Sequence, residues 1–193
     1  MNATPQVRRT PLRKRALLVI DVQNEYFTGR LPVTHPAGSF DNILAVMDAA
    51  HRAGVPTAVI RHGSPEPDSP VFREGSHEWE LHADIASRPR DILIDKEWPD
   101  SFHSTGLRGW LADFEIDTVA IAGYMTQMCC QTTASRAWHL GYEVEFIADA
   151  TGTLDRKGFA GPVTADELYR SVIATLGRFA DVTSTAEWLT RIA

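Results

Sequence analysis

Short apolar runs without polar alternation recur along this chain, and they constrain its fold more than any other feature. Residues 16–20, 57–61 and 118–122 are almost wholly apolar, which is typical of strands that are covered on both faces. Segments with helical spacing lie between these runs, and Gly, Pro or Asp marks most boundaries. The pattern predicts an α/β fold, a Rossmann-like three-layer αβα arrangement around a six-stranded, mainly parallel sheet.

The predicted elements follow from this pattern. Strands are expected at residues 16–20, 57–61, 92–94, 118–122, 143–148 and 181–184. Helices are expected from 39 or 41 to 54 and at 107–114, 129–140, 165–179 and 185–192. At 193 residues and 44% hydrophobic, the chain suits one domain over residues 1–193, with residues 1–14 as a flexible arm.

Charge and leader patterns exclude several classes of protein. The net charge is −6, so no overall positive field attracts nucleic acid or an anionic membrane, and we expect neither as a partner. A basic segment at residues 8–15 precedes the apolar run 16–20, but five apolar residues ending at Asp21 are too few for a signal peptide. We therefore expect a cytoplasmic protein with reduced thiols.

Polar residues that directly follow the predicted strands are the candidates for chemistry. Asp21 ends the first strand, Lys96 lies just past the third, and the two cysteines of the chain, Cys129 and Cys130, follow the fourth. Ligands of open α/β sheets bind beyond the carboxyl ends of the strands, so these side chains should share one edge. Each also has an ordinary structural explanation, as a cap, a solvated charge or a buried thiol.

The adjacent cysteines cannot form an ordinary disulfide, because neighbours in sequence are far from the usual bridge geometry. Both could be buried thiols that act as small apolar side chains. Alternatively one of them reacts. Two long irregular stretches, 22–37 and 62–90, add to the expectation of a functional site, since long loops in a compact domain are more often functional than idle.

Four motifs in a fixed order resemble one family. They are the run DVQNEYF from Asp21, Lys96 followed by the Ser101-Phe102 pair and the Thr105-Gly106-Leu107 run, the GYMTQMC run that ends at Cys129, and the Asp149-Ala150-Thr151 run. In this order they resemble the isochorismatase-like cysteine hydrolase superfamily, which includes nicotinamidases and carbamoylsarcosine amidases. The resemblance runs from about residue 16 to residue 183.

The resemblance implies a mechanism and an assembly. Cys129 would be the nucleophile, Asp21 the general base and Lys96 the third member of a catalytic triad, while Cys130 would fill the core. Such an enzyme cleaves a C–N bond of a small amide, ureido compound or lactam through a thioester. The family's oxyanion donors correspond to the N–H groups of Met125 and Cys129, with a cis peptide bond between Tyr124 and Met125. A homodimer or homotetramer is also implied.

Two local effects would favour the reactive anion of Cys129. It is expected at a helix N-terminus and close to Lys96, and both should lower the pKa of the thiol.

Several further residues are candidates for binding the substrate. Each of them has core packing or a local hydrogen bond as an alternative role. These candidates are Gln23, Phe27, His62, Trp98, Phe102 and Thr126, and the three aromatic rings among them, Phe27, Trp98 and Phe102, are expected to wall a small pocket together with Tyr124.

No metal or cofactor is expected. Nicotinamidases of this superfamily carry an Asp-x-His set with further histidines after the second strand, whereas here His62 is followed only distantly by His77 and His82. Two alternatives stay open: an isochorismatase-type enol-ether hydrolase, and a redox protein whose Cys129 reacts with peroxide. Nucleotide-binding and serine-hydrolase motifs are absent from the sequence.

Overall fold

The computed structural model describes residues 14–66 and 68–193. Six strands form one sheet in which every pairing is parallel. They are β1 (Arg15–Ile20), β2 (Thr57–His62), β3 (Ile92–Lys96), β4 (Thr118–Tyr124), β5 (Glu143–Gly152) and β8 (Asp181–Thr183). The predicted six-stranded sheet is therefore confirmed. The flexible arm predicted for residues 1–14 lies outside the described residues, apart from Lys14.

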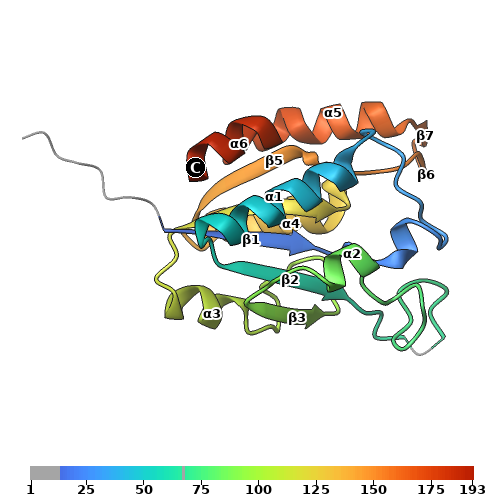
Figure 1. The fold of residues 1–193 in the computed structure, drawn as a ribbon. Coiled ribbons are helices and arrows are strands. Elements are labelled where there is room, and N and C mark those ends of the chain that lie inside the picture. Colours follow the sequence, from blue (N-terminus) through green and yellow to red (C-terminus); the bar gives the residue numbers. More distant parts are fainter. Residues whose placement is uncertain (1–13, 67) are drawn as a thin grey trace, which may run out of the picture.

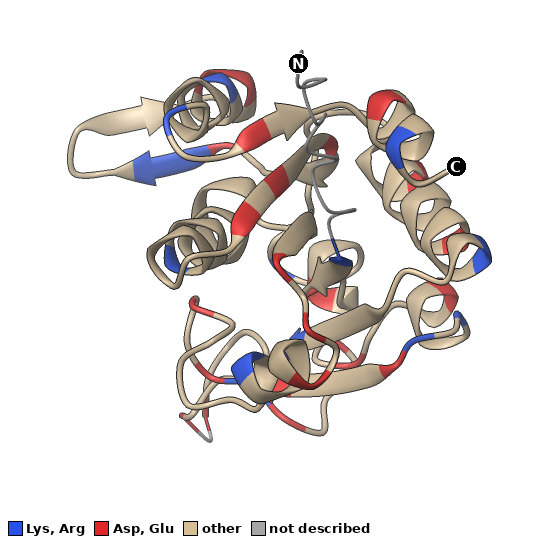
Figure 2. Ribbon diagram, turned by 90° about the vertical axis from the view of Figure 1, so that its left-hand side faces the viewer, with Lys and Arg blue, Asp and Glu red and all other residues tan. Residues whose placement is uncertain are grey.

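Helices cover both faces of the sheet and complete the predicted three layers (Figure 2). One face carries α1 (Ser39–Ala53), α2 (Ala83–Ala86) and α6 (Thr185–Ile192), and the other carries α3 (Leu107–Asp113), α4 (Gln131–His139) and α5 (Ala165–Leu176). Side chains of β1 alternate between two cores, with Leu17 and Val19 on the α1 side and Leu18 and Ile20 on the α4 side. This double burial explains why the strands read as continuous apolar runs.

Short elements without periodicity were not predicted. A hairpin of β6 (Arg156–Gly158) and β7 (Gly161–Val163) projects from the body, as Figure 1 shows at its upper right. A 3-10 turn, η1 (Asn24–Tyr26), follows β1, and a π-helical turn, η2 (Thr126–Cys130), precedes α4. In the described part of the chain, no helix is both long and apolar enough to cross a membrane.

The strand order reverses direction beside β1. The order is β3-β2-β1-β4-β5-β8, so the chain moves to one side of β1 with β2 and β3 and to the other side with β4. Strand order thus reverses between β1 and β4, where ligands of open α/β sheets bind. In Figure 1, β1, β2 and β3 point toward the end that carries the long loop of residues 63–82 and the β6–β7 hairpin.

β1 and β4 approach so closely at this point that one position must be glycine. Gly123 pairs with Ile20 and has φ of +118°. A Cβ atom at Gly123 would lie 2.1 Å from the carbonyl oxygen of Ile20. Neither the backbone angle nor the space therefore accepts a side chain.

Replacing Gly123 by Ala should lower the free energy of unfolding by about 3 kcal/mol or more, because it adds backbone strain to a clash with a central strand. The matched control is Gly109→Ala in α3, where a Cβ meets nothing within 4 Å. Because Ala favours helix, that change should stabilise the protein by roughly 0.5–1 kcal/mol. Urea denaturation of both variants measures the difference, and equal stabilities would contradict it.

Candidate active site

Three side chains from different strand ends meet at the point where the strand order reverses. Asp21 directly follows β1, Lys96 is the last residue of β3, and Cys129 lies in η2 after β4. Lys96 Nζ donates a hydrogen bond to Asp21 Oδ2 at 2.8 Å and another to Cys129 Sγ at 3.3 Å. The Asp21 and Lys96 side chains are fully buried, and Cys129 is 6% exposed. The structure thus brings together the three residues that the sequence placed at strand ends.

The backbone holds Asp21 in an uncommon conformation. Its φ is +53°, a region that Asp visits more readily than most residues. Its N–H donates to the carbonyl of Ile60, and its own carbonyl accepts from the N–H of Gln23, each at 2.9 Å. Carboxylate oxygen Oδ1 is buried and has no hydrogen-bond partner among the described residues. A buried acceptor without a partner is costly, and binding a proton would remove that cost. Oδ1 is therefore available to take a proton.

Charge interactions keep Lys96 protonated in spite of its burial. Burial alone would lower the pKa of Lys96, but the nearby Asp21 and Cys129 outweigh this effect and raise the pKa above its ordinary value. The site therefore contains a buried ammonium paired with a carboxylate.

The thiol of Cys129 is protonated in this resting arrangement. Burial raises its pKa well above the ordinary value, and the charge of Asp21 raises it further, while Lys96 acts in the opposite direction. Lys96 thus lowers the pKa of this thiol as expected, but desolvation and the adjacent carboxylate, which the expectation left out, outweigh its effect. Deprotonation must accompany attack on a substrate.

Cys130 lies in the core on the α4 side of the sheet and is fully buried. Burial also raises the pKa of its thiol, and Cys129 adds to this effect. The two adjacent cysteines therefore differ in their surroundings, since Cys129 contacts the ion pair and Cys130 packs among apolar side chains.

The turn between β4 and η2 contains the expected cis peptide bond, between Tyr124 and Met125. Tyr124 is buried, and its hydroxyl lies 3.3 Å from Ser39 Oγ. Thr126 is also buried and donates its hydroxyl proton to Thr151 Oγ1 at 2.9 Å. These two side chains tie the turn to α1 and β5.

Gln23 uses both ends of its amide on the backbone. Its Nε2 donates to the carbonyls of His62 (2.8 Å) and Trp79 (2.7 Å), and its Oε1 accepts from the N–H of His62 (2.9 Å). The side chain is fully buried. An amide has two N–H donors, so Gln23 has none left for a substrate and instead joins β2 to the long loop.

The four aromatic residues expected to wall a pocket are only partly brought together. The rings of Phe27 and Tyr124 are 6.1 Å apart. Phe102 is buried on the α4 side and stacks on Tyr142 at 5.9 Å. Trp98 is 53% exposed. Together with Lys96 it lines a cavity of about 210 Å³.

Sequence reasoning missed two aromatic residues beside the site. Tyr26 is buried, and burial together with the nearby Cys129 raises its pKa well above the ordinary value. Its ring packs edge-on against Phe72 at 5.3 Å, and the ring of Phe72 lies 5.0 Å from that of His62. Tyr26 belongs to a motif quoted above and could have been found, whereas Phe72 lies in an irregular loop without a recognisable signal.

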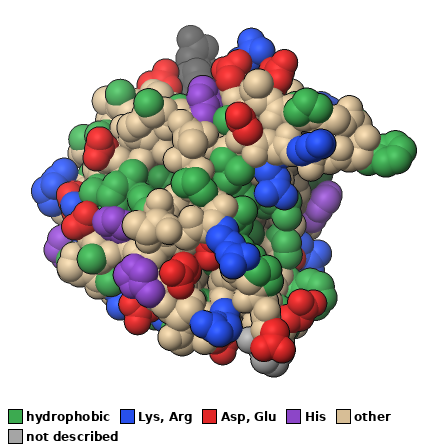
Figure 3. All heavy atoms as spheres, turned by 90° about the vertical axis from the view of Figure 1, so that its right-hand side faces the viewer, with side chains coloured by type: hydrophobic (Ala, Val, Ile, Leu, Met, Phe, Trp, Pro, Cys, Tyr) green, Lys and Arg blue, Asp and Glu red, His purple; other side chains and the backbone are tan. Residues whose placement is uncertain are grey.

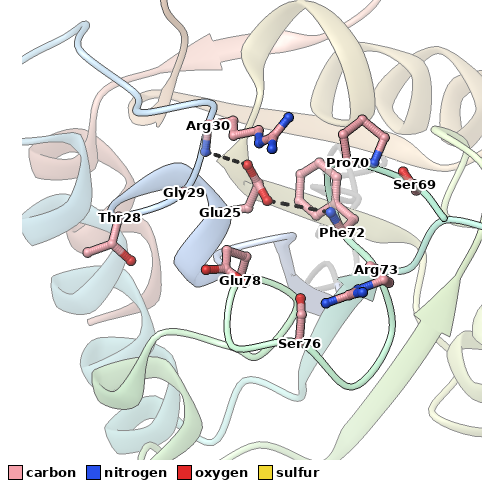
Figure 4. Close-up of a pocket in the computed structure, with 10 residues that line it drawn as sticks. All are labelled: Glu25, Thr28, Gly29, Arg30, Ser69, Pro70, Phe72, Arg73, Ser76 and Glu78. Atoms are coloured by element: carbon pink, nitrogen blue, oxygen red, sulfur yellow. Dashed lines mark hydrogen bonds between the residues drawn. The ribbon is translucent and has the colours of Figure 1, made fainter.

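A larger cavity of about 460 Å³ opens beside this cluster (Figure 4). Phe72 and Glu25 both line it, and the Glu25 carboxylate accepts the backbone N–H of Arg30 at 2.6 Å. Neither Asp21 nor Cys129 lines this cavity. Figure 3 shows the same end of the molecule, where hydrophobic side chains gather centrally among charged residues and histidines.

Within residues 14–66 and 68–193, no group of three His, Cys, Asp or Glu side chains is arranged to hold a metal ion. The chemical groups that do converge are one thiol, one carboxylate and one ammonium. Such a set can move a proton from sulfur to oxygen and stabilise the resulting charges.

Comparisons with known proteins agree with this geometry. The sequence model of the isochorismatase domain matches residues 15–187. The crystal structure of a protein from Burkholderia xenovorans LB400 is similar, with 44% sequence identity and a TM-score of 0.91. The match covers 94% of this chain and 88% of that protein. A cysteine hydrolase from Pseudomonas syringae pv. phaseolicola 1448A is 29% identical with a TM-score of 0.85, covering 99% of this chain and 98% of its own.

Nicotinamidase 3 of Arabidopsis thaliana is similar as well. It is 29% identical over 201 residues, which cover 89% of this chain and 98% of that protein. The family model spans most of the chain, so the resemblance inferred from the four motifs is confirmed. This chain belongs to the isochorismatase domain family of hydrolases.

Proposed function

We propose that this hydrolase cleaves a C–N bond of a small molecule, an amide, ureido compound or lactam, through a thioester on Cys129. One observation carries the proposal: a single buried ammonium, Lys96 Nζ, contacts both the Asp21 carboxylate and the Cys129 sulfur. The names of two similar proteins, a nicotinamidase and a cysteine hydrolase, support the same chemistry.

The proposed reaction starts from the neutral thiol. Sulfur of Cys129 attacks the carbonyl carbon while its proton passes to Asp21, whose Oδ1 is buried without a partner among the described residues. The C–N bond then breaks as Asp21 returns that proton to the departing nitrogen, so ammonia or an amine leaves. Water next attacks the thioester and gives a proton to Asp21, and this proton passes to the departing sulfur to restore the thiol. The acid released is a carboxylic acid, or a carbamic acid when the substrate is a ureido compound.

Lys96 and two backbone N–H groups would stabilise the charges that develop. During attack the carboxylate becomes neutral and negative charge moves to the carbonyl oxygen. We assign the N–H groups of Met125 and Cys129, which flank the turn after the cis bond, as donors to this oxyanion. Loss of one such donor typically costs on the order of 3 kcal/mol of transition-state stabilisation.

Replacing Cys129 by Ala should abolish release of ammonia or amine, because no other thiol contacts Lys96 and Asp21 among the described residues. The matched control is Cys130→Ala, one position away, which should keep most of the activity. Both variants would be assayed against a panel of small amides, ureido compounds and lactams. Equal loss in both variants, or rapid peroxide consumption by a wild-type protein that cleaves no amide, would count against the proposal.

Replacing Asp21 by Asn should have opposite effects on thiol reactivity and on turnover. The charge of Asp21 raises the pKa of Cys129, so its removal lowers that pKa and leaves Lys96 free to pair with a thiolate. Alkylation of Cys129 by iodoacetamide at pH 7, measured in a Cys130→Ala background, should therefore become faster. Amide cleavage should fall by 100-fold or more, roughly the contribution of a general base.

The wild-type protein should show the complementary pH dependence. Because the pKa of the Cys129 thiol is raised, alkylation should be slow at pH 7 and rise steadily toward alkaline pH. If alkylation and turnover instead decreased together in Asp21→Asn, Asp21 would be an activator of the thiolate and not the base proposed here.

A further inference from the structure

The imidazole ring of His62 lies beside Lys96, one member of the ion pair. It is the last residue of β2 and pairs in register with Lys96 on β3. Its Nδ1 is 3.4 Å from Lys96 Nζ, and its ring packs edge-on against Phe72. The mechanism above gives this side chain no task.

The number of hydrogen bonds that Lys96 can donate indicates a role for His62. An ammonium has three N–H donors and no acceptor. The structure offers three acceptors, which are Asp21 Oδ2 at 2.8 Å, Cys129 Sγ at 3.3 Å and His62 Nδ1 at 3.4 Å. Because an ammonium can only donate, a hydrogen bond across the 3.4 Å contact requires an unprotonated Nδ1, and the proton of a neutral imidazole then sits on Nε2.

We propose that His62 is a positioning residue: its neutral Nε2–H tautomer accepts the third hydrogen bond of Lys96 and so holds the ammonium between the carboxylate and the sulfur. This inference rests on the proposed function of Lys96, Asp21 and Cys129. It assigns His62 a task that differs from the substrate contact expected from the sequence.

The surroundings of His62 favour the neutral ring. Burial lowers its pKa below the ordinary value and the charge of Lys96 lowers it further, while Asp21 and a hydrogen bond of the ring to the backbone of Lys96 act in the opposite direction. Lys96 and Asp21 are the charged groups that act on the ring, from β3 and from the end of β1, and the long loop contributes the uncharged Phe72. Protonation at acid pH would remove the acceptor and place a second cation beside Lys96.

The backbone of His62 is fixed independently of its ring. Gln23 accepts from the N–H of His62 and donates to its carbonyl. Both contacts hold the end of β2 at the level of Lys96, so substitutions of the His62 side chain can leave the strand in place.

The first test is the tautomer in the wild-type protein, which needs no substrate. Nitrogen-15 NMR of the imidazole rings separates an unprotonated Nδ1 from a protonated one, and the spectrum of His62→Asn identifies the His62 signals among seven histidines. We expect an unprotonated Nδ1 near pH 7.5 and titration below the ordinary value of about 6.5. A proton on Nδ1 at that pH would overturn the proposal.

The second test separates positioning from packing. His62→Ala removes the acceptor, while His62→Asn keeps an uncharged acceptor near the place of Nδ1. Using a substrate from the amide panel, we expect His62→Ala to lower kcat roughly 10- to 100-fold, the usual effect of a hydrogen bond to a charged group. KM should change little, and His62→Asn should recover most of kcat. Equal kcat in both variants would contradict the proposal.

Controls separate a failure of the His62 role from misfolding and from a failure of the proposed function. His139→Gln, an exposed change on α4, should resemble wild type, and melting temperatures identify any variant that fails to fold. If Cys129→Ala stayed active, the proposed function would fail whatever the tautomer of His62. If Cys129→Ala were inactive and His62→Ala fully active, only the positioning role would fail.

Discussion

The structure of the site depends on one interaction, the buried ion pair between Lys96 and Asp21. Moving an ammonium and a carboxylate out of water costs several kcal/mol for each ion even after the protein relaxes, and their attraction offsets this only with good geometry and further hydrogen bonds. Here the further partners of the ammonium are a sulfur and an imidazole nitrogen. The groups that make burial tolerable are the same groups that the proposed chemistry needs.

The parallel sheet supplies the rigidity that this geometry requires. Asp21 leaves β1, His62 ends β2 and Lys96 ends β3, and these strands are hydrogen-bonded neighbours in the order β3-β2-β1. Their side chains therefore keep their spacing through backbone ladders and not through flexible loops. Cys129 is set on the other side by the close approach of β4 to β1 at Gly123. Sites built on such elements hold distances more closely than sites built on loops.

The sequence predicted the sheet well, because burial on both faces leaves uninterrupted apolar runs such as residues 16–20 and 118–122. It also predicted that Asp21, Lys96 and Cys129 would meet, since the ends of parallel strands share an edge. It could not predict quantities that depend on three-dimensional surroundings. The raised pKa of Cys129 reflects desolvation and a carboxylate 108 positions away along the chain. The backbone role of Gln23 and the approach of Phe72 likewise depend on a loop that carries no periodic signal.

Gln23 anchors one part of the long loop to the strands through hydrogen bonds to backbone carbonyls. The segment from Glu78 to His82 lies along residues 22–25 and is joined to them mainly by backbone hydrogen bonds. The side chain of Gln23 adds a hydrogen bond to the carbonyl of Trp79. Backbone atoms are common to all amino acids, so this anchorage makes little demand on side-chain identity. Substitutions of exposed residues in the segment from Ser69 to Ser76, such as Arg73, can therefore change the wall of the larger cavity while this backbone anchorage stays intact.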